Sequence, residues 1–519
     1  MGMQMVGLAD IVRTHAIGQG AAVALVHDGR PTTYGHLHQA SNRVAQGLIA
    51  EGIRPQSRVA HLDKSSDLFF DLLFGVSKVG AVMVSVNWRL AAPEVLHIVN
   101  DADAEILFVG EEFFPVIDEI RDQLRSVREI VALSGVHPGW EPFARWRDRH
   151  PNIDPQHPAK ASDTAVQFYT SGTTGLPKGA ELTNSNFASM FRYWSRSWQL
   201  EPGRRSIVCL PMFHIGGAGW GMAGLYAGAT NYVVREFVPA QILDIIQSHR
   251  IEVALFVPAM ILFLLQAPQV RETDLSSLQL IVYGAAPIPA ELLKQAMAVF
   301  GCGFQQVYGL TETTGAITLL PTEDHDPSNA KKLLSCGYAQ KEVELRIIGD
   351  DGRDLPPGEV GEIAVRSPQV MGGYWKLPDA TARAVKGDWF LTGDAGYLDD
   401  EGYLYIYDRV KDMIVSGGEN IYPAEVESAL FGHPAVADVA VIGVPDERWG
   451  EAVKAVVVTK PGSVVTAAEL IDWARSRIAG YKLPKSIDFI DALPRNPTGK
   501  ILKRELRKAY WSDRTRQVN

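Results

Sequence analysis

Two patterns of hydrophobic and polar positions alternate along the first two-thirds of the chain. Amphipathic stretches such as residues 69–79 and 93–99 repeat apolar side chains with the spacing of a helix. Compact apolar runs, typical of buried strands, occur at residues 81–86, 106–109, 166–169, 207–210, 253–257 and 280–283. Buried strands that alternate with helices indicate an α/β architecture with parallel or mixed sheets.

The pattern changes near residue 343. Residues 343–347 and 362–366 alternate with period two, as half-exposed strands do. Asp351-Gly352 and Pro356-Pro357-Gly358 form turn sequences between them. We therefore expect a β-rich subdomain at about residues 340–409.

A third unit is expected at the end of the chain. Strand-like runs at 439–444, 453–458 and 487–490 accompany a helical pattern at 467–478. The charged segment 408–412 precedes them and marks the predicted boundary. The sequence thus predicts an N-terminal domain over residues 1–409 and a C-terminal domain over residues 410–519.

Length and composition narrow the class of protein. A chain of 519 residues exceeds what one hydrophobic core organises, and its net charge of −10 gives no reason to expect nucleic acid. Three scattered cysteines without a CxxC pair fit a reducing compartment. Residues 1–15 lack the apolar core of a signal peptide, and no apolar stretch is long enough for a bilayer span. We expect a cytoplasmic protein without a transmembrane segment. Its composition is compatible with peripheral membrane contact.

The most informative motif is Tyr-Thr-Ser-Gly-Thr-Thr-Gly-Leu-Pro-Lys-Gly at residues 169–179. Its glycines let backbone N–H groups face an anion, its hydroxyls add donors, and its lysine supplies a mobile positive charge. The spacing is not that of a Walker A loop. The motif predicts a phosphate-binding loop made of Thr170, Ser171, Gly172, Thr173, Thr174, Gly175 and Lys178.

This string resembles the signature of the adenylate-forming superfamily, which includes acyl-CoA synthetases, nonribosomal peptide adenylation domains and beetle luciferases. The resemblance extends over residues 34–506, with further motifs in the family's order. It implies a multidomain α/β fold, in which a large layered N-terminal domain with a β subdomain precedes a small, mobile α+β C-terminal domain.

A second motif, Tyr-Gly-Leu-Thr-Glu at residues 308–312, contains a carboxylate suited to Mg²⁺. The resemblance implies that Glu312 holds the metal, Thr311 contacts the α-phosphate and Tyr308 packs on the adenine. It also implies that small residues let the adenine ring and the acyl group approach the backbone. These are Gly284, Ala285, Ala286 and Gly309.

The remaining predicted site residues also rest on the resemblance. Asp394 and Arg409 bind the ribose, and Lys411 is the hinge about which the C-terminal domain turns. Lys500 reaches the active site during adenylation, where a cation between two anionic reactants lowers their repulsion. The coenzyme A arm contacts Ser416, Gly417 and Gly418.

His214 and Trp220 are predicted to line the acyl pocket together with Gly284 and Gly309. His214 is assigned to binding and not to acid–base chemistry. Trp220 is displaced from the position of the tryptophan that gates some long-chain fatty acid enzymes.

The sequence therefore predicts an AMP-forming acyl-CoA ligase that uses ATP, Mg²⁺ and coenzyme A, with a medium- to long-chain fatty acid as the first choice of substrate. Alternatives within the superfamily are a ligase that loads a carrier-protein thiol and a coenzyme A ligase for an aryl or polycyclic acid. Two other classes of protein are alternatives. A kinase or ATPase would release ADP in place of AMP, and a non-enzymatic nucleotide-binding protein would bind ATP without turnover. A monomer or homodimer is expected.

Overall fold

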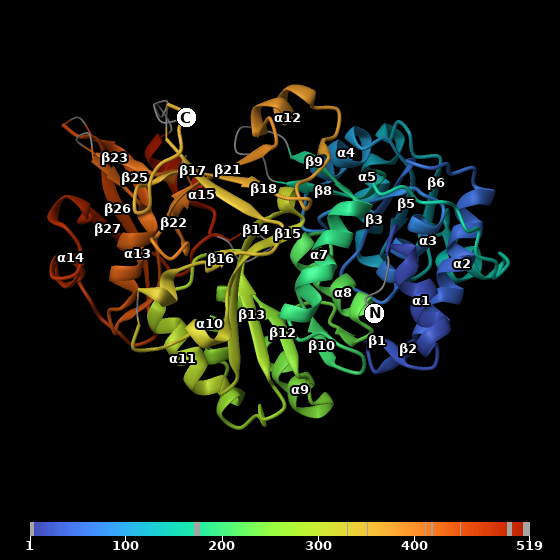
Figure 1. Ribbon diagram of the computed structural model, residues 1–519, viewed down its shortest axis with the longest axis horizontal. Helices are drawn as coiled ribbons and strands as arrows, with labels where there is room; N and C mark the ends of the chain where they lie inside the picture. Colours follow the sequence, from blue (N-terminus) through green and yellow to red (C-terminus); the bar gives the residue numbers. More distant parts are fainter. Residues whose placement is uncertain are drawn as a thin grey trace.

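The computed structural model describes residues 5–170, 177–329, 331–349, 351–409, 412–416, 419–446, 448–495 and 501–511. Four β-sheets organise these residues, two large ones formed mostly by strands before residue 340 and two smaller ones formed by strands after it. Figure 1 shows the last sheet and its helices as a separate lobe beside the larger body.

The first sheet has eight strands and is parallel at its centre. Its order is β19-β9-β8-β4-β3-β5-β6-β7, and the pairings β8–β9 and β9–β19 are antiparallel. The strands are β3 (Arg58–Leu62), β4 (Val82–Ser85), β5 (Ala104–Val109), β6 (Glu129–Ala132), β7 (Glu141–Pro142), β8 (Thr164–Thr170), β9 (Lys178–Thr183) and β19 (Gly373–Tyr374).

The second sheet has nine strands in the order β16-β15-β14-β13-β12-β10-β11-β1-β2. Strands β14, β13, β12, β10, β11 and β1 run parallel to one another. The strands are β1 (Val23–His27), β2 (Arg30–Thr33), β10 (Arg205–Val208), β11 (Thr230–Val233), β12 (Val253–Phe256), β13 (Leu280–Gly284), β14 (Gly303–Leu310), β15 (Gly315–Leu320) and β16 (Tyr338–Ala339).

Helices cover both faces of each large sheet, as buried parallel strands require. One hydrophobic cluster joins the two sheets through α1 (Ala9–Gln19), α2 (Tyr34–Ala50), α3 (Leu68–Lys78), α6 (Phe143–Asp148), α7 (Asn184–Ser197) and α8 (Ile215–Ala227). The outer face of the first sheet packs on α4 (Ala92–Asp101) and α5 (Phe114–Ile120). The outer face of the second packs on α9 (Pro239–His249), α10 (Pro258–Gln266) and α11 (Ala290–Phe300).

The third sheet is antiparallel and comprises β17 (Glu344–Ile348), β18 (Gly361–Arg366), β20 (Val385–Lys386), β21 (Trp389–Leu398) and β22 (Leu404–Arg409). Helix α12 (Pro378–Ala384) precedes β20. This sheet forms where the sequence predicts the β-rich subdomain, and the exact domain boundary stays a prediction.

The fourth sheet forms the C-terminal lobe. It comprises β23 (Ile414–Ser416), β24 (Glu419–Ile421), β25 (Val436–Asp446), β26 (Gly450–Thr459) and β27 (Ser486–Phe489). One face packs on α13 (Pro423–Phe431) and α14 (Ala467–Arg475), and the other packs on α15 (Lys503–Trp511). Across the described ranges, no helix combines the length and the apolar character needed to cross a membrane.

Candidate active site

Several predicted site residues of the second sheet lie where its strands end. Gly284 closes β13, Gly309 lies next to the end of β14, and His214 follows β10, all three strands being parallel in one sheet. In open α/β sheets, ligands bind at the carboxyl ends of such strands. The second sheet therefore assembles its candidate residues on the edge where a nucleotide site is expected.

Glu312 connects this edge to the first sheet. Its side chain belongs to a short 3-10 helix, residues Thr311–Thr313, and is only 9% exposed. The hydroxyl of Thr170, at the end of β8, donates to Oε1 of Glu312 at 3.4 Å. The first residue of the phosphate-loop motif thus contacts the predicted metal ligand, 142 positions away in the sequence.

Lys178 lies on the other side of the phosphate loop. Antiparallel pairing of β8 with β9 places it directly opposite Thr170. Its ammonium group lies 4.9 Å from the centre of the Tyr374 ring. The Tyr374 hydroxyl in turn donates to Oε1 of Glu312 at 2.8 Å. Three predicted residues and one that the sequence analysis missed therefore form one group.

Tyr374 was missed because its motif, Gly-Gly-Tyr-Trp at residues 372–375, contains no residue type that by itself indicates chemistry. Its position became informative only when the fold paired β19 with β9 and set Tyr374 beside Ala180.

Asp394 and Arg409, predicted to bind ribose, lie opposite each other in the antiparallel pairing of β21 with β22. The Asp394 side chain is buried and accepts a hydrogen bond of 2.9 Å from the Tyr308 hydroxyl. Burial, together with the Asp394 charge, raises the pKa of the Tyr308 hydroxyl well above its ordinary value. Tyr308 is therefore a lasting donor that fixes the orientation of the carboxylate.

Close backbone approach explains the glycines of the site. A Cβ at Gly284 would lie 2.2 Å from the Val307 carbonyl oxygen, and one at Gly309 would lie 1.8 Å from that of Gly315. Ala285 has a φ of 67°, a strained conformation for a residue with a side chain. These contacts hold β13, β14 and the loop that carries Glu312 together more tightly than side chains would allow.

His214 is suited to a binding role. It precedes α8, and the ring nitrogen Nε2 is buried without a hydrogen-bond partner among the described residues. Burial and, to a lesser extent, the charge of Arg89 lower the pKa of His214 to about 4. The imidazole is therefore neutral at physiological pH. The adjoining Ile215 reaches the loop after β14, because its Cγ1 lies 3.6 Å from the Cβ position of Gly315.

The lining role of Trp220 stays a prediction, and the structure shows the residue packed in the core. Its indole is 2% exposed and lies at a tilt of 46° to the Trp198 ring, with 5.2 Å between ring centres. The indole N–H donates to Ser206 Oγ at 2.9 Å and to the Ile207 carbonyl at 3.1 Å. Because α8 turns this ring into the core, it presents almost no surface to a substrate.

Several predicted residues lie outside the described residues, namely Ser171, Gly172, Thr173, Thr174, Gly175, Lys411, Gly417, Gly418 and Lys500. Two of the segments that flank them are described. Ser416 pairs with Glu419 and with Gly450, and Arg495 pairs with Ile501 in an antiparallel bridge. A hydrogen bond of 2.8 Å from Leu502 N–H to the Pro494 carbonyl adds to the second pairing.

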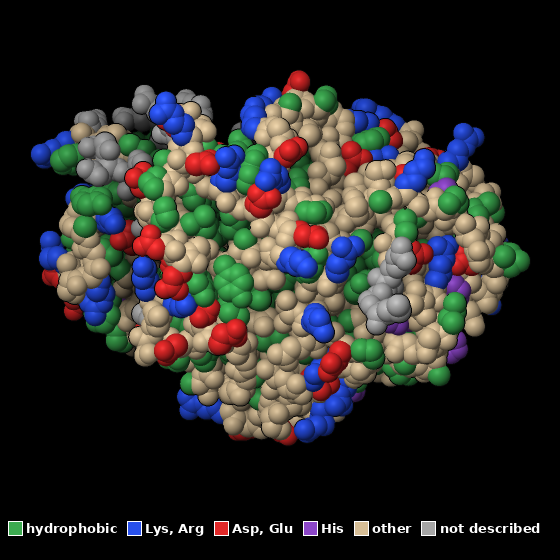
Figure 2. All heavy atoms as spheres, viewed as in Figure 1, with side chains coloured by type: hydrophobic (Ala, Val, Ile, Leu, Met, Phe, Trp, Pro, Cys, Tyr) green, Lys and Arg blue, Asp and Glu red, His purple; other side chains and the backbone are tan. Residues whose placement is uncertain are grey.

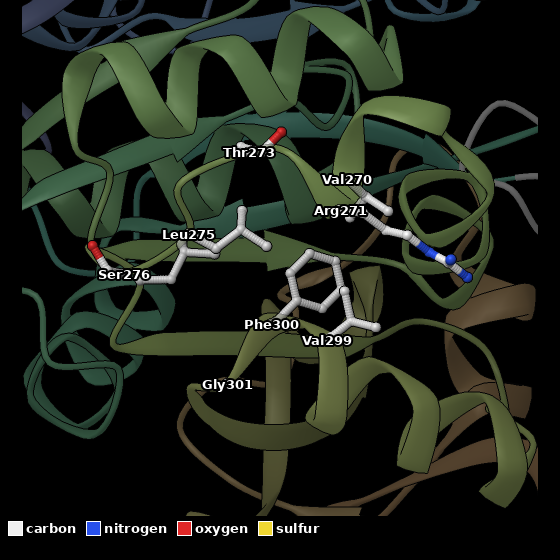
Figure 3. A pocket seen from close by; sticks show the side chains of 9 residues that line it. Val270, Arg271, Thr273, Leu275, Ser276, Val299, Phe300 and Gly301 are labelled. Atoms are coloured by element: carbon white, nitrogen blue, oxygen red, sulfur yellow. The ribbon is translucent and has the colours of Figure 1, made fainter.

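A shallow cavity of about 520 Å³ lies elsewhere, at the opposite edge of the second sheet (Figure 3). Leu278 precedes β13 and Gly301 precedes β14, so this cavity borders the amino ends of those strands. It is therefore separated from the group around Glu312 by the length of the strands. Its remaining lining residues are Val270, Arg271, Thr273, Leu275, Ser276, Val299 and Phe300.

Comparison with known proteins decides the family. The family model of AMP-binding enzymes matches residues 12–375, and the model of the AMP-binding enzyme C-terminal domain matches residues 425–500. The chain belongs to the AMP-binding enzymes. It is accordingly an adenylate-forming ligase, and its two-domain α/β fold is that of the family.

Three relatives of this AMP-binding enzyme illustrate the range of the family. The fatty acid–[acyl-carrier-protein] ligase ScoC of Streptomyces coeruleorubidus is 42% identical, with 99% of each chain covered. The long-chain-fatty-acid–CoA ligase FadD13 of Mycobacterium tuberculosis is 38% identical, covering 92% of this chain and 93% of the relative. The crystal structure of the anthranilate CoA ligase AuaEII with anthranoyl-AMP has a TM-score of 0.92 at 28% identity and covers 98% of both chains.

Proposed function

We propose that this enzyme condenses a fatty acid with ATP to form an acyl-adenylate and then transfers the acyl group to coenzyme A. The observation that carries the proposal is the convergence of Thr170, Lys178 and Glu312 at one site from three separate elements. The family assignment and the fatty acid ligases among the relatives support the same reaction.

In the first half-reaction, a carboxylate oxygen of the substrate attacks the α-phosphorus of ATP, and the bond to pyrophosphate breaks. We assign Lys178, at the start of β9, to bind the departing phosphates, and Asp394, opposite Arg409, to accept hydrogen bonds from the ribose hydroxyls. Lys500 is assigned to stabilise the negative charge that develops between carboxylate and α-phosphate.

Glu312 fits a role as the protein ligand of Mg²⁺. One buried carboxylate, with hydroxyl groups bound to a single oxygen, suits an ion that takes one or two carboxylates and completes its shell with water and phosphate. When bound with ATP, Mg²⁺ supplies positive charge to the polyphosphate. A dense cluster of acidic ligands is not needed, and none is found within the part of the chain that the structure describes.

In the second half-reaction, the thiol sulfur attacks the acyl carbonyl, the bond to AMP breaks and the thiol proton passes to solvent. We assign binding of the coenzyme A arm to Ser416 and the two residues after it, Gly417 and Gly418. Rotation of the C-terminal lobe about Lys411 brings these residues to the acyl-adenylate. A mixed anhydride is reactive enough that no acid–base residue is required for this step.

A carrier-protein thiol is the specific alternative to coenzyme A as the acceptor of the acyl group. ScoC, a ligase for an acyl carrier protein, matches this chain over its full length at 42% identity. An aryl acid is the corresponding alternative for the acyl group, since AuaEII is an anthranilate ligase of closely similar structure. We favour a fatty acid because both ScoC and FadD13 use one.

The deciding experiment supplies ATP, Mg²⁺ and a panel of fatty and aryl acids with either coenzyme A or a phosphopantetheinylated carrier protein. Acid-dependent AMP, pyrophosphate and acyl-CoA are expected, and Lys500→Ala should be nearly silent in adenylation. Formation of acylated carrier protein without acyl-CoA would mean that the carrier-protein thiol, and not coenzyme A, is the acceptor. ADP and phosphate would contradict it.

We propose a cytoplasmic location for this reaction, because ATP and coenzyme A are available together there. We propose a monomer or homodimer as the working form. Light scattering at several protein concentrations distinguishes the two.

A further inference from the structure

We propose that Tyr374 is a positioning residue of the adenylation step, which orients Glu312 for the metal-bound polyphosphate and holds Lys178 ready for the same phosphates. This inference rests on the proposed function of Glu312 and Lys178. It adds a residue to which neither the motifs nor the family assignment gives a role.

The backbone fixes where Tyr374 can lie. Strand β19 pairs with β9, with Gly373 opposite Glu181 and Tyr374 opposite Ala180. The Trp375 N–H donates to the Gly179 carbonyl at 2.8 Å, which extends the pairing by one residue. Successive side chains of an extended segment point to opposite sides, so Tyr374 and Trp375 diverge.

Trp375 anchors one side of this segment in the first sheet. The Arg58 guanidinium lies 3.4 Å from the centre of its ring, and its indole N–H donates to the Asp101 carbonyl at 2.9 Å. On the other side, the Tyr374 N–H donates to Thr381 Oγ1 at 2.9 Å. The backbone that carries Tyr374 is therefore fixed by contacts on both of its sides.

Glu312 is held by the same segment through two hydrogen bonds. Its carboxylate accepts the Tyr374 hydroxyl at 2.8 Å, and its main-chain carbonyl accepts the Met371 N–H at 2.8 Å. Thr170 adds the second, longer hydroxyl contact to the same oxygen, Oε1. Because both hydroxyls bind Oε1, they hold the carboxylate in one orientation and leave Oε2 to the metal in the proposed role.

Tyr374 contacts Lys178 as well as Glu312. Its hydroxyl donates to the Glu312 carboxylate, and its ring face attracts the Lys178 ammonium, 4.9 Å from the ring centre. One side chain thus contacts both the group assigned to the metal and the group assigned to the phosphates.

The chain contains a matched control for this arrangement. The Tyr403 hydroxyl donates to Asp324 Oδ2 at 2.7 Å, and the Lys332 ammonium lies 4.2 Å from the centre of the Tyr403 ring. A tyrosine, a carboxylate and a lysine therefore meet in a similar way next to the start of β22, with Asp324 in the place of a glutamate. None of these three residues belongs to the predicted site.

The experiment compares Tyr374→Phe, Tyr374→Leu and Tyr403→Phe by two measurements besides turnover. One is the affinity for a non-hydrolysable ATP analogue with and without Mg²⁺, and the other is Mn²⁺ binding followed by paramagnetic resonance. Tyr374→Phe keeps the ring for Lys178 but removes the donor to Glu312. We expect it to weaken the metal-dependent affinity about tenfold and to leave the metal-free affinity unchanged.

Tyr374→Leu also removes the ring, so it should weaken the metal-free affinity as well. Tyr403→Phe should change neither affinity, whatever it does to the melting temperature. If Tyr374→Phe binds metal and nucleotide like the wild type while Glu312→Gln does not, the positioning role is wrong and the proposed function stands. If Glu312→Gln also binds like the wild type, the assignment of the metal site fails first.

Discussion

Tyr308 and Asp394 are joined by a hydrogen bond of 2.9 Å between two buried side chains from different sheets. Tyr308 lies near the carboxyl end of β14, and Asp394 lies opposite Arg409 in the antiparallel sheet. This contact connects the nine-stranded sheet to the subdomain that supplies the predicted ribose ligands.

Tyr308→Phe removes the donor of this bond and should lower the free energy of unfolding by about 1–3 kcal/mol, because a buried carboxylate loses a partner. AMP affinity should fall with it, since Asp394 is no longer held in place. Calorimetric titration with AMP and urea unfolding measure the two effects. Tyr34→Phe is the control, because its hydroxyl donates to the Ala229 carbonyl at 2.7 Å away from the site. Equal AMP affinity in both variants would refute the coupling.

Because His61 is buried, we expect the free energy of unfolding to depend on pH. It is 2% exposed, its ring packs edge-on to Phe69, and burial lowers its pKa from 6.5 to about 3. Between these two values the unfolded chain binds a proton that the folded chain does not, so stability falls as the pH falls through this window. The loss from this one group should reach about 1.4 kcal/mol at about pH 5.5.

His61→Phe keeps the ring and removes the titration. Urea unfolding at about pH 7.5 and about pH 5.5 should show a smaller loss of stability on acidification in the variant than in the wild type. The same loss in both would show that His61 is not protonated on unfolding in this window.

Gly309 should tolerate no side chain. An added Cβ would lie 1.8 Å from the Gly315 carbonyl oxygen, which is backbone and can move only if the loop around Glu312 moves. We expect Gly309→Ala to cost about 1–3 kcal/mol in stability and to reduce acid-dependent pyrophosphate exchange. Gly18→Ala, in α1 with no atom within 4 Å of its Cβ position, should leave exchange unchanged and should raise stability slightly. Normal exchange in Gly309→Ala would show that the loop geometry is not needed for adenylation.

Trp220→Phe tests the position of that residue in the core. The substitution removes an indole N–H that bonds to Ser206 and Ile207, so stability should fall by about 1–3 kcal/mol. The relative rates with acids of different chain length should stay as in the wild type. A change in the relative rates with acids of different chain length would show that Trp220 lines the acyl pocket.

The apolar patterns predicted those elements whose burial is uniform. Residues 106–109 lie within β5 and 453–458 lie within β26, because strands covered on both faces read as continuous apolar runs. The helix predicted at 467–478 ends at Arg475, since the apolar Ile478 lies beyond the last regular turn. A pattern identifies an element more reliably than it identifies its end.

The sequence identified candidate site residues where the chemistry of a motif is local in sequence. The motifs around Thr170, Lys178 and Glu312 predicted residues that the fold brings into one group. Tyr374 could not be predicted, because its role depends on the pairing of a two-residue strand with β9, and no periodicity specifies such a pairing. The burial of Trp220 could not be predicted, because the sequence of α8 does not reveal which side of the helix faces the core when both sides are apolar or small.

The most direct test of the acyl-adenylate uses a fatty acid labelled with oxygen-18 in its carboxylate. If the carboxylate oxygen attacks the α-phosphorus, one labelled oxygen must appear in AMP once the thioester has formed, and mass spectrometry of AMP detects it. Labelled AMP is the predicted result. Label in inorganic phosphate beside ADP, or unlabelled AMP beside labelled thioester alone, would contradict the account.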